Sequence, residues 1–258
     1  MTLVLSERRG PAVVLTFNRP DKLNALSTSM LNELERRLDE AEGDVDVRVV
    51  ILTGAGEKAF VAGADIGEYA EQDEEAFGEY QRYSRRLFTR IDRFPKPVVG
   101  AVNGYALGGG FEIALCCDVL IASSNARFGL PEGLLGLSPG GGGTQRLTRA
   151  AGPFVAADVL LSARRLSAED AFRLGLVAEV VDSERLMETA LAKAEAMAKL
   201  APLATTEMLR LIEVAGDAEL EEGLTVEQSA LARLRASADA AEGIDAFVNK
   251  REPKFRGA

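Results

Sequence analysis

The segment VRVVILT, residues 47–53, constrains the fold of this chain more than any other feature. It is almost entirely apolar, which is typical of a parallel strand whose two faces are both covered. Residues 28–42 follow a predicted N-cap, Ser27, and carry apolar side chains at helical spacing. This apolar stripe consists of Met30, Leu31, Leu34, Leu38 and Ala41. Further strands are predicted at residues 13–17, 98–102 and 119–122. The alternation predicts an α/β fold with helices packed on a mostly parallel sheet.

Two longer stretches are predicted to be helical. Residues 67–92 alternate aromatic and aliphatic side chains with charges, which predicts one long amphipathic helix that ends before Pro95. From about Ser183 to the end the pattern is helical, with no strand signal. We therefore expect a core over residues 1–182 that holds the functional site and a helical region over residues 183–258 that serves assembly.

Composition excludes several classes of partner. The 30 Lys and Arg residues against 40 Asp and Glu residues give a net charge of −10, which argues against nucleic acid or an anionic membrane as the main partner. Glycine or charge interrupts every apolar run well before the roughly 20 residues of a membrane span, and the first ten residues lack a secretory apolar region. Cys116 and Cys117 are adjacent, too close for an ordinary structural disulfide. We expect a cytoplasmic protein.

The chain contains no histidine. This excludes Ser-His-Asp and Cys-His catalysis, histidine general bases and histidine-containing metal sites, and no metal site is predicted. If the protein is an enzyme, its proton chemistry falls to carboxylates, lysine, tyrosine or backbone amides.

Two of the three glycine-rich stretches are weak signals. Residues 54–59, GAGEKA, match a dinucleotide-binding fingerprint, but no helical pattern follows the glycines, so a surface turn explains them better. Residues 140–143 are four glycines without the lysine of a P-loop. They are interpreted either as a flexible loop leading into a helix at residues 144–150 or as backbone donors that support an active site.

The third stretch, Gly108 to Gly110, precedes a short apolar segment that contains Glu112. Glycines at a helix start let backbone N–H groups approach a ligand, and these can stabilise an oxyanion. Glu112 is then either a carboxylate that complements the helix dipole or part of a catalytic site. A second acid, Glu132, lies in a similar apolar and glycine-flanked setting. Without histidine, the two favour a general acid/base pair, although sequence spacing does not show that they meet.

Along nearly its whole length the chain resembles the enoyl-CoA hydratase/isomerase (crotonase) superfamily. The motifs that carry this resemblance are NRPDKLNAL at 18–26, AFVAGADI at 59–66, KPVVGAVNGYALGGGFEIALCCD at 96–118, ARFGLPEGLLGLSPGGGGTQRL at 126–147, AEDAFRLGLVAEVV at 168–181 and AFVNKREPKF at 246–255. The resemblance implies a spiral of ββα units with a helical C-terminal trimerisation region, commonly assembled as a hexamer built from two trimers.

The resemblance also implies roles for individual residues. The backbone N–H groups of Ala64 and Gly109 match the pair that stabilises the enolate of a thioester. Glu112 and Glu132 match the acids that hold one water: Glu112 helps to activate it for attack on C3 of a trans-2-enoyl-CoA, and Glu132 exchanges the proton at C2. Gly140 matches the glycine whose N–H supports the second glutamate.

Coenzyme A is part of the implied substrate, so no separate cofactor is expected. Its binding region in the family matches Lys22, Leu23 and Ala25 on a first loop, Ala62, Ala64, Asp65, Ile66 and Gly67 on a second, and Phe247 and Lys250 near the C-terminus. In relatives the C-terminal helix can reach the CoA of a neighbouring subunit. A core aromatic and a solvated charge explain Phe247 and Lys250 equally well.

Retention of both glutamates favours hydration of an enoyl-CoA to a 3-hydroxyacyl-CoA in fatty-acid or related acyl-CoA degradation. Two other reactions stay open, namely double-bond isomerisation and hydration of a branched or ring-substituted acyl-CoA. A binding protein without activity, including one that binds RNA, is disfavoured by the net charge and the intact acid pair. The loop SPGGGG and Gly67 depart from the common family pattern, which leaves the preferred chain length open.

Overall fold

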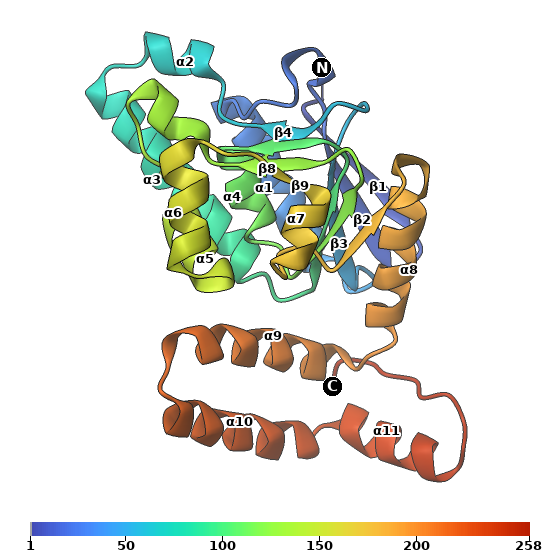
Figure 1. The fold of residues 1–258 in the computed structure, drawn as a ribbon. Helices are drawn as coiled ribbons and strands as arrows, with labels where there is room; N and C mark the ends of the chain where they lie inside the picture. Colours follow the sequence, from blue (N-terminus) through green and yellow to red (C-terminus); the bar gives the residue numbers. More distant parts are fainter. Residues whose placement is uncertain (1) are drawn as a thin grey trace.

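The computed structural model describes residues 2–258 and contains two sheets with helices around them (Figure 1). The larger sheet has the order β1-β2-β3-β5-β7-β10, and β1 alone pairs antiparallel with its neighbour. Its strands are β1 (Val4–Arg9), β2 (Ala12–Phe17), β3 (Val49–Gly54), β5 (Val98–Val102), β7 (Val119–Ser123) and β10 (Glu179–Val181). The predicted α/β fold with a mostly parallel sheet is confirmed.

The smaller sheet has the order β4-β6-β8-β9. Its strands are β4 (Ala59–Ala62), β6 (Tyr105–Leu107), β8 (Arg127–Gly129) and β9 (Leu166–Ser167). β4, β6 and β8 run parallel, and β9 runs antiparallel to β8. The sequence analysis explained residues 54–59 by a surface turn and predicted no strand at β4, because strands of two to four residues are too short to show a reliable apolar period.

The helices are α1 (Thr28–Gly43), α2 (Ile66–Glu71), α3 (Glu74–Asp92), α4 (Gly109–Ala114), α5 (Gly143–Ala151), α6 (Pro153–Ser162), α7 (Ala168–Arg173), α8 (Leu186–Ala198), α9 (Pro202–Asp217), α10 (Leu220–Arg235) and α11 (Ala238–Val248), with short 3-10 turns η1 (Pro20–Lys22), η2 (Pro131–Leu135) and η3 (Ser183–Arg185). Three times the chain passes from a strand of the large sheet to one of the small sheet and then into a helical segment: β3-β4-α2, β5-β6-α4 and β7-β8-η2. The fold is therefore the expected spiral of ββα units.

Both faces of the large sheet are covered, as the apolar strands predict. Along β3, Val50 and Leu52 belong to the main core, whereas Val49 and Ile51 face a second core that is completed by α8. The contact with α8 shows that this helix, although it lies beyond residue 182, packs directly on the sheet.

Helix α1 begins as predicted, since the Ser27 hydroxyl accepts a hydrogen bond from the Met30 N–H. Its buried residues are Met30, Leu31, Leu34, Leu38 and Ala41, the predicted stripe. The single helix predicted over 67–92 is wrong, because α2 ends at Glu71 and α3 begins at Glu74. The Asp73 carboxylate accepts from the Ala76 N–H, so an N-cap starts a new helix and the backbone at Gln72 is extended.

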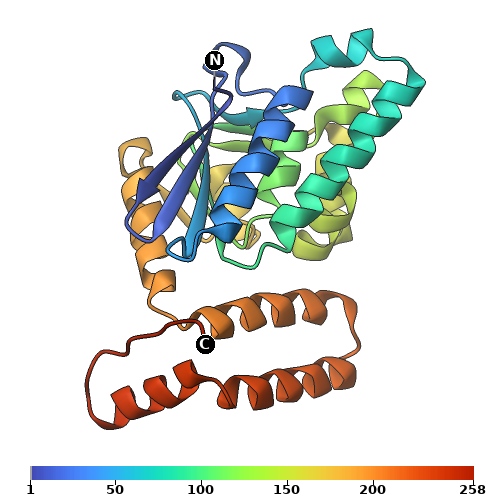
Figure 2. The ribbon, with the colours of Figure 1, turned by 180° about the vertical axis from the view of Figure 1, so that it is seen from behind.

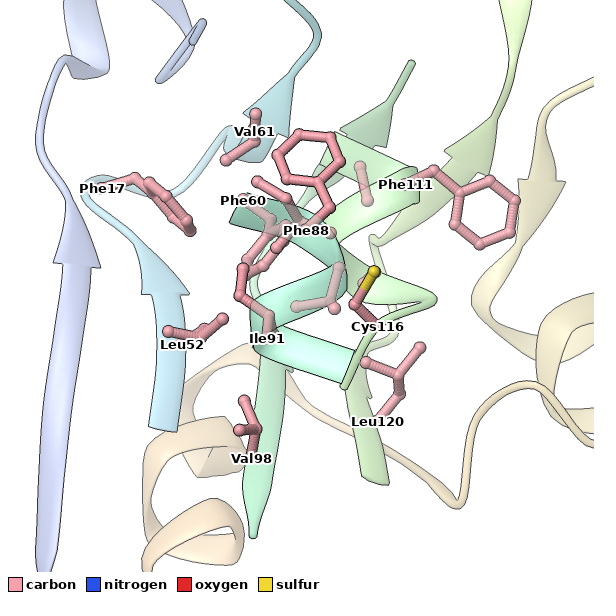
Figure 3. Packing of buried hydrophobic residues seen from close by; sticks show 14 of the residues in the cluster. Phe17, Leu52, Phe60, Val61, Phe88, Ile91, Val98, Phe111, Cys116 and Leu120 are labelled. Atoms are coloured by element: carbon pink, nitrogen blue, oxygen red, sulfur yellow. The ribbon is translucent and has the colours of Figure 1, made fainter. Parts of the chain in front are cut away.

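The main core joins α3 and α4 to strands of both sheets. Phe88 comes from α3 and Phe111 from α4, and both are buried with Phe60 of β4 in one cluster (Figure 3). Phe60 also meets Phe17 of β2 edge to face, with ring centroids 5.5 Å apart. Because α4 carries Glu112, this packing sets the position of that carboxylate.

Helices α9, α10 and α11 form a layer that stands apart from the sheets, and α8 connects it to them (Figures 1 and 2). The C-terminal tail returns to this layer, where the buried Asp239 carboxylate accepts from the Arg256 and Gly257 N–H groups. The helical nature of the region after Ser183 is confirmed. In residues 2–258, no helix is long and apolar enough to span a membrane.

Candidate active site

Four predicted site residues line one cavity of about 510 Å³ at the edge of the small sheet. Ala64 follows β4, Gly109 follows β6 and Glu132 follows β8, so the carboxyl ends of three parallel strands deliver them to the same edge. Glu112 enters the cavity from the first turn of α4. The structure therefore brings together the two acids and the two backbone groups that the sequence analysis singled out.

The N–H groups of Ala64 and Gly109 are available to a ligand. Ala64 forms a parallel bridge with Leu26, in which the Gly63 carbonyl accepts from Leu26 N and the Leu26 carbonyl accepts from Asp65 N, each at 2.8 Å. This pattern leaves the Ala64 N–H outside the bridge. Gly109 is the first residue of α4, so its N–H has no acceptor within the helix. Neither N–H has a protein acceptor within residues 2–258.

The consecutive glycines before Glu112 meet separate steric demands. Gly108 has φ +51°, and the Glu132 Oε1 atom would lie 3.1 Å from a Cβ placed there. At Gly110 a Cβ would lie 2.0 Å from the Val61 carbonyl oxygen of β4. The helix can therefore approach the strand that leads to Ala64 only because Gly110 has no side chain.

Replacement of Gly110 by Ala is expected to push α4 away from β4, because the clash is with backbone that cannot rotate aside. We expect a loss of about 3 kcal/mol of stability, which lowers Tm by roughly 10 °C in thermal unfolding. Gly216→Ala is the matched control, since no atom lies within 4 Å of a Cβ on that glycine of α9. Equal melting of the two variants would contradict the tight contact.

Glu112 is only 4% exposed, and its Oε1 accepts hydrogen bonds from the Gly141 and Gly143 N–H groups, both at 2.8 Å. Arg146 holds this glycine loop in place: it donates to the Gly141 carbonyl at 2.8 Å and pairs with Asp92 at 2.9 Å. Burial leaves the pKa of Glu112 above its usual value, although the backbone N–H bonds and Arg146 act in the opposite direction. The loop thus stabilises the ionised form of this carboxylate.

Glu132 occupies a different environment. It is the second residue of η2 and is half-buried, and its Oε2 atom is buried without a hydrogen-bond partner in the described part of the chain. Burial raises the pKa of Glu132 from 4.5 to about 7, and the nearby Glu112 charge contributes to the rise. The two acids therefore differ: hydrogen bonds support the charge of Glu112, whereas the surroundings of Glu132 favour its protonated form near neutral pH.

The prediction for Gly140 requires correction. The glycine loop donates to Glu112 through Gly141 and Gly143, and no hydrogen bond from Gly140 to Glu132 occurs in residues 2–258. Gly140 lines the cavity beside Gln81, whose Oε1 would lie 2.2 Å from a Cβ on this glycine. Four consecutive glycines marked the loop, but their identity alone did not show which N–H groups turn inward.

The residues matched to the CoA-binding region lie on two adjoining loops, since the Ala62 N–H donates to the Leu23 carbonyl at 3.0 Å. Ala62, Ala64 and Ile66 line the cavity, whereas Lys22, Leu23, Ala25, Asp65 and Gly67 lie outside its lining. The Asp65 carboxylate is occupied within the chain: Oδ1 accepts from the Gly67 N–H at 3.1 Å, and Oδ2 pairs with Arg19 at 2.9 Å. Arg19 thereby joins the two loops.

Phe247 and Lys250 do not reach this cavity within the same chain. Phe247 lies on α11 and is 85% exposed, so its interpretation as a core aromatic is wrong. Contact with the CoA of a neighbouring subunit stays a prediction for both residues.

Other cavity residues were not identified as site residues from the sequence. Tyr69, Phe77, Tyr80 and Gln81 come from α2 and α3, and Leu134 comes from η2. The aromatic residues did appear as the apolar face of a helix, but a face that lines a cavity has the same spacing as one that packs in a core. The Gln81 amide donates to the Tyr69 hydroxyl at 2.9 Å, which fixes part of this wall.

One cavity thus contains two backbone donors, which can stabilise an oxyanion, and two acids, which can transfer protons, as expected of an enzyme active site. Residues 7–258 match the sequence model of the enoyl-CoA hydratase/isomerase family, and the chain belongs to this family.

The sequence similarity to known proteins extends over nearly the whole chain. The chain is 42% identical to the short-chain-enoyl-CoA hydratase of Clostridium acetobutylicum, over 96% of this chain and 95% of that protein. It is 41% identical to the 2,3-dehydroadipyl-CoA hydratase of Escherichia coli, with 100% of both chains covered. Among solved structures, an enoyl-CoA hydratase from Bacillus anthracis superposes with a TM-score of 0.96 at 38% identity, over 99% of this chain and 100% of that one.

Proposed function

We propose that the protein adds water across the 2,3 double bond of a trans-2-enoyl-CoA to give a 3-hydroxyacyl-CoA. The observation that carries this proposal is the arrangement of Glu112 and Glu132 in the cavity that also contains the unpaired N–H groups of Ala64 and Gly109. The names of the relatives, which include short-chain and crotonyl-CoA hydratases, support the same reaction.

The proposed reaction uses the two acids in opposite ways. A water that donates to the ionised Glu112 carboxylate loses a proton as its oxygen bonds to C3. The electrons of the double bond move onto the thioester oxygen, where the Ala64 and Gly109 N–H groups stabilise the enolate. A proton from Glu132 then reaches C2 and re-forms the thioester carbonyl. The proton left on Glu112 returns to Glu132 through solvent, so one water is added in each cycle.

The test is an assay of crotonyl-CoA and longer 2-enoyl-CoAs by the loss of their conjugated absorbance. We expect turnover on at least one chain length, with the 3-hydroxyacyl-CoA as product. No turnover on any of them would refute the proposal.

Double-bond isomerisation is the alternative reaction within the family. An enzyme of that kind needs one group that moves a proton between carbons, and Glu132, with a pKa near 7, can serve. A 3-enoyl-CoA distinguishes the two activities. An isomerase would release the 2-enoyl-CoA before any hydroxyacyl product. The presence of a second acid, Glu112, in the cavity favours hydration.

The assembly into trimers or hexamers also belongs to this proposal. The C-terminal layer exposes large apolar side chains that a monomer leaves in water: Ile212, Leu220, Leu231, Phe247 and Val248. Such a surface supports contact with another copy. We also propose a cytoplasmic location, because the sequence shows no secretory apolar region and no apolar run of membrane-spanning length. No cofactor is proposed, because CoA is part of the substrate.

A further inference from the structure

Leu26, the residue before the N-cap of α1, holds the peptides on both sides of Ala64. Its N–H donates to the Gly63 carbonyl, and its carbonyl accepts from the Asp65 N–H, each at 2.8 Å. The Gly63 carbonyl and the Ala64 N–H belong to one planar trans peptide and point in opposite directions. The bond from Leu26 to Gly63 therefore turns the Ala64 N–H away from residue 26 and leaves it free for a ligand.

The side chain of Leu26 lies beside the second donor. It is buried, and its Cδ1 atom would lie 3.0 Å from a Cβ on Gly109. The Gly109 N–H is directed in a similar way to the first donor, since the Gly108 carbonyl of the same peptide accepts from the Glu112 N–H at 3.0 Å. One residue thus orients the first donor through its backbone and packs beside the second through its side chain.

Tyr80 of α3 ties Leu26 to the core. Its ring is buried, and its hydroxyl lies 3.3 Å from the Leu26 carbonyl oxygen. A carbonyl can only accept, so the Tyr80 hydroxyl donates its single proton to it, whereas the adjacent Tyr69 hydroxyl has a proton of its own. The Tyr69 ring meets the Tyr80 ring edge to face, with centroids 5.2 Å apart, which helps to keep the hydroxyl in place. Together with the Asp65 N–H, this hydroxyl fills both acceptor positions of the Leu26 carbonyl.

On the basis of the proposed hydration, we propose that Leu26 is a positioning residue for both oxyanion donors, and that the Tyr80 hydroxyl keeps Leu26 in place. Backbone donors stabilise an enolate well only when they already point at the place where the charge develops. Since Leu26 bonds to the segment of Ala64 and packs beside Gly109, its displacement should affect every reaction that passes through the enolate. Hydration and exchange of the C2 protons both do so.

Tyr80→Phe removes the hydroxyl and keeps the ring. We expect kcat for hydration of crotonyl-CoA and the rate of C2 proton exchange of butyryl-CoA in D₂O to fall by a similar factor, about 3- to 10-fold, with KM changed by less than about twofold. Tyr83→Phe is the matched control, because the Tyr83 hydroxyl lies on the same helix and donates to Glu35 at 2.9 Å, outside the cavity lining. It should leave both rates unchanged.

The side-chain contact of Leu26 is tested separately. Leu26→Val removes the Cδ1 atom beside Gly109 and is expected to lower both rates about 3- to 10-fold, because a small displacement of a donor weakens its bond to the enolate. Leu26→Met, which fills a similar volume, should restore most of the loss.

The thioester carbonyl of bound butyryl-CoA gives a readout that needs no turnover. Two aligned donors polarise this bond, so its infrared stretch should lie at lower frequency in the wild-type complex than in solution. Tyr80→Phe and Leu26→Val should each remove part of this shift, whereas Tyr83→Phe should not. A purely structural role would lower the melting temperature without moving the stretch.

The outcomes separate this inference from the proposed function. If the wild-type protein lowers the stretch, if both variants lose part of the shift and if no 2-enoyl-CoA is hydrated, the proposed function fails and the inference stands. Unchanged rates and an unchanged stretch in Tyr80→Phe would overturn the inference. So would a loss confined to KM that varies with acyl chain length, because Tyr80 would then act by contact with the acyl chain. A wild-type protein that does not bind butyryl-CoA, or binds it without a shift, would also overturn it.

Discussion

Glu132→Gln is expected to lower kcat for hydration about 10²- to 10⁴-fold, because the amide cannot give a proton to C2. The same variant should lose exchange of the C2 protons of butyryl-CoA with D₂O, a reaction that needs the proton-transferring group but no addition to C3. Activity of the wild-type enzyme should fall as pH rises through about 7, where Glu132 loses its proton. Hydration close to the wild-type rate in this variant would show that Glu132 is structural.

The pH dependence of thermal stability offers an independent check on Glu132. The direction of this dependence follows from the raised pKa of Glu132. The folded protein holds this proton up to about pH 7, whereas an ordinary glutamate releases it near 4.5. The contribution of the protonated form is fully present below pH 4.5 and is lost as pH rises through 7. Because Gln stays neutral, the variant should melt above wild type at pH 8 and close to it at pH 4.5. The difference between their melting curves isolates Glu132 from other acids.

Glu112→Gln is expected to lower kcat by a similar factor for a different reason. The amide oxygen can still accept from the Gly141 and Gly143 N–H groups, so the loop should keep its position, but the base that takes the proton from water is gone. Exchange of the C2 protons of butyryl-CoA should survive, since Glu132 remains. Loss of both hydration and exchange would assign the two acids to one shared step.

Glu112→Ala is the control that separates catalysis from structure. It removes the acceptor and leaves two buried N–H groups without a partner, at a cost of about 1–3 kcal/mol for each. We therefore expect Glu112→Ala to melt well below Glu112→Gln while both lack hydration. Identical melting temperatures would mean that the loop does not depend on the carboxylate.

Some parts of the fold were predictable because their signal is local. Ser27 and the stripe on α1 were predicted residue by residue, since a cap and an amphipathic face are properties of neighbouring residues. The division between α2 and α3 was not, because the apolar spacing continues across it and Asp73 was not identified as a cap. Strand β4 was missed because its four residues are buried by long-range contacts with β6 and α4.

The sequence by itself limited the chemistry that this protein can perform: without histidine, proton transfer falls to carboxylates, lysine, tyrosine or backbone amides, and the family motifs favour Glu112 and Glu132 among them. Only the tertiary structure decided how the two acids differ. Two N–H groups reach Glu112 from a loop about 30 residues away, while one oxygen of Glu132 is left without a partner. Burial and hydrogen bonding set a pKa, and both depend on residues that come together only when the chain folds.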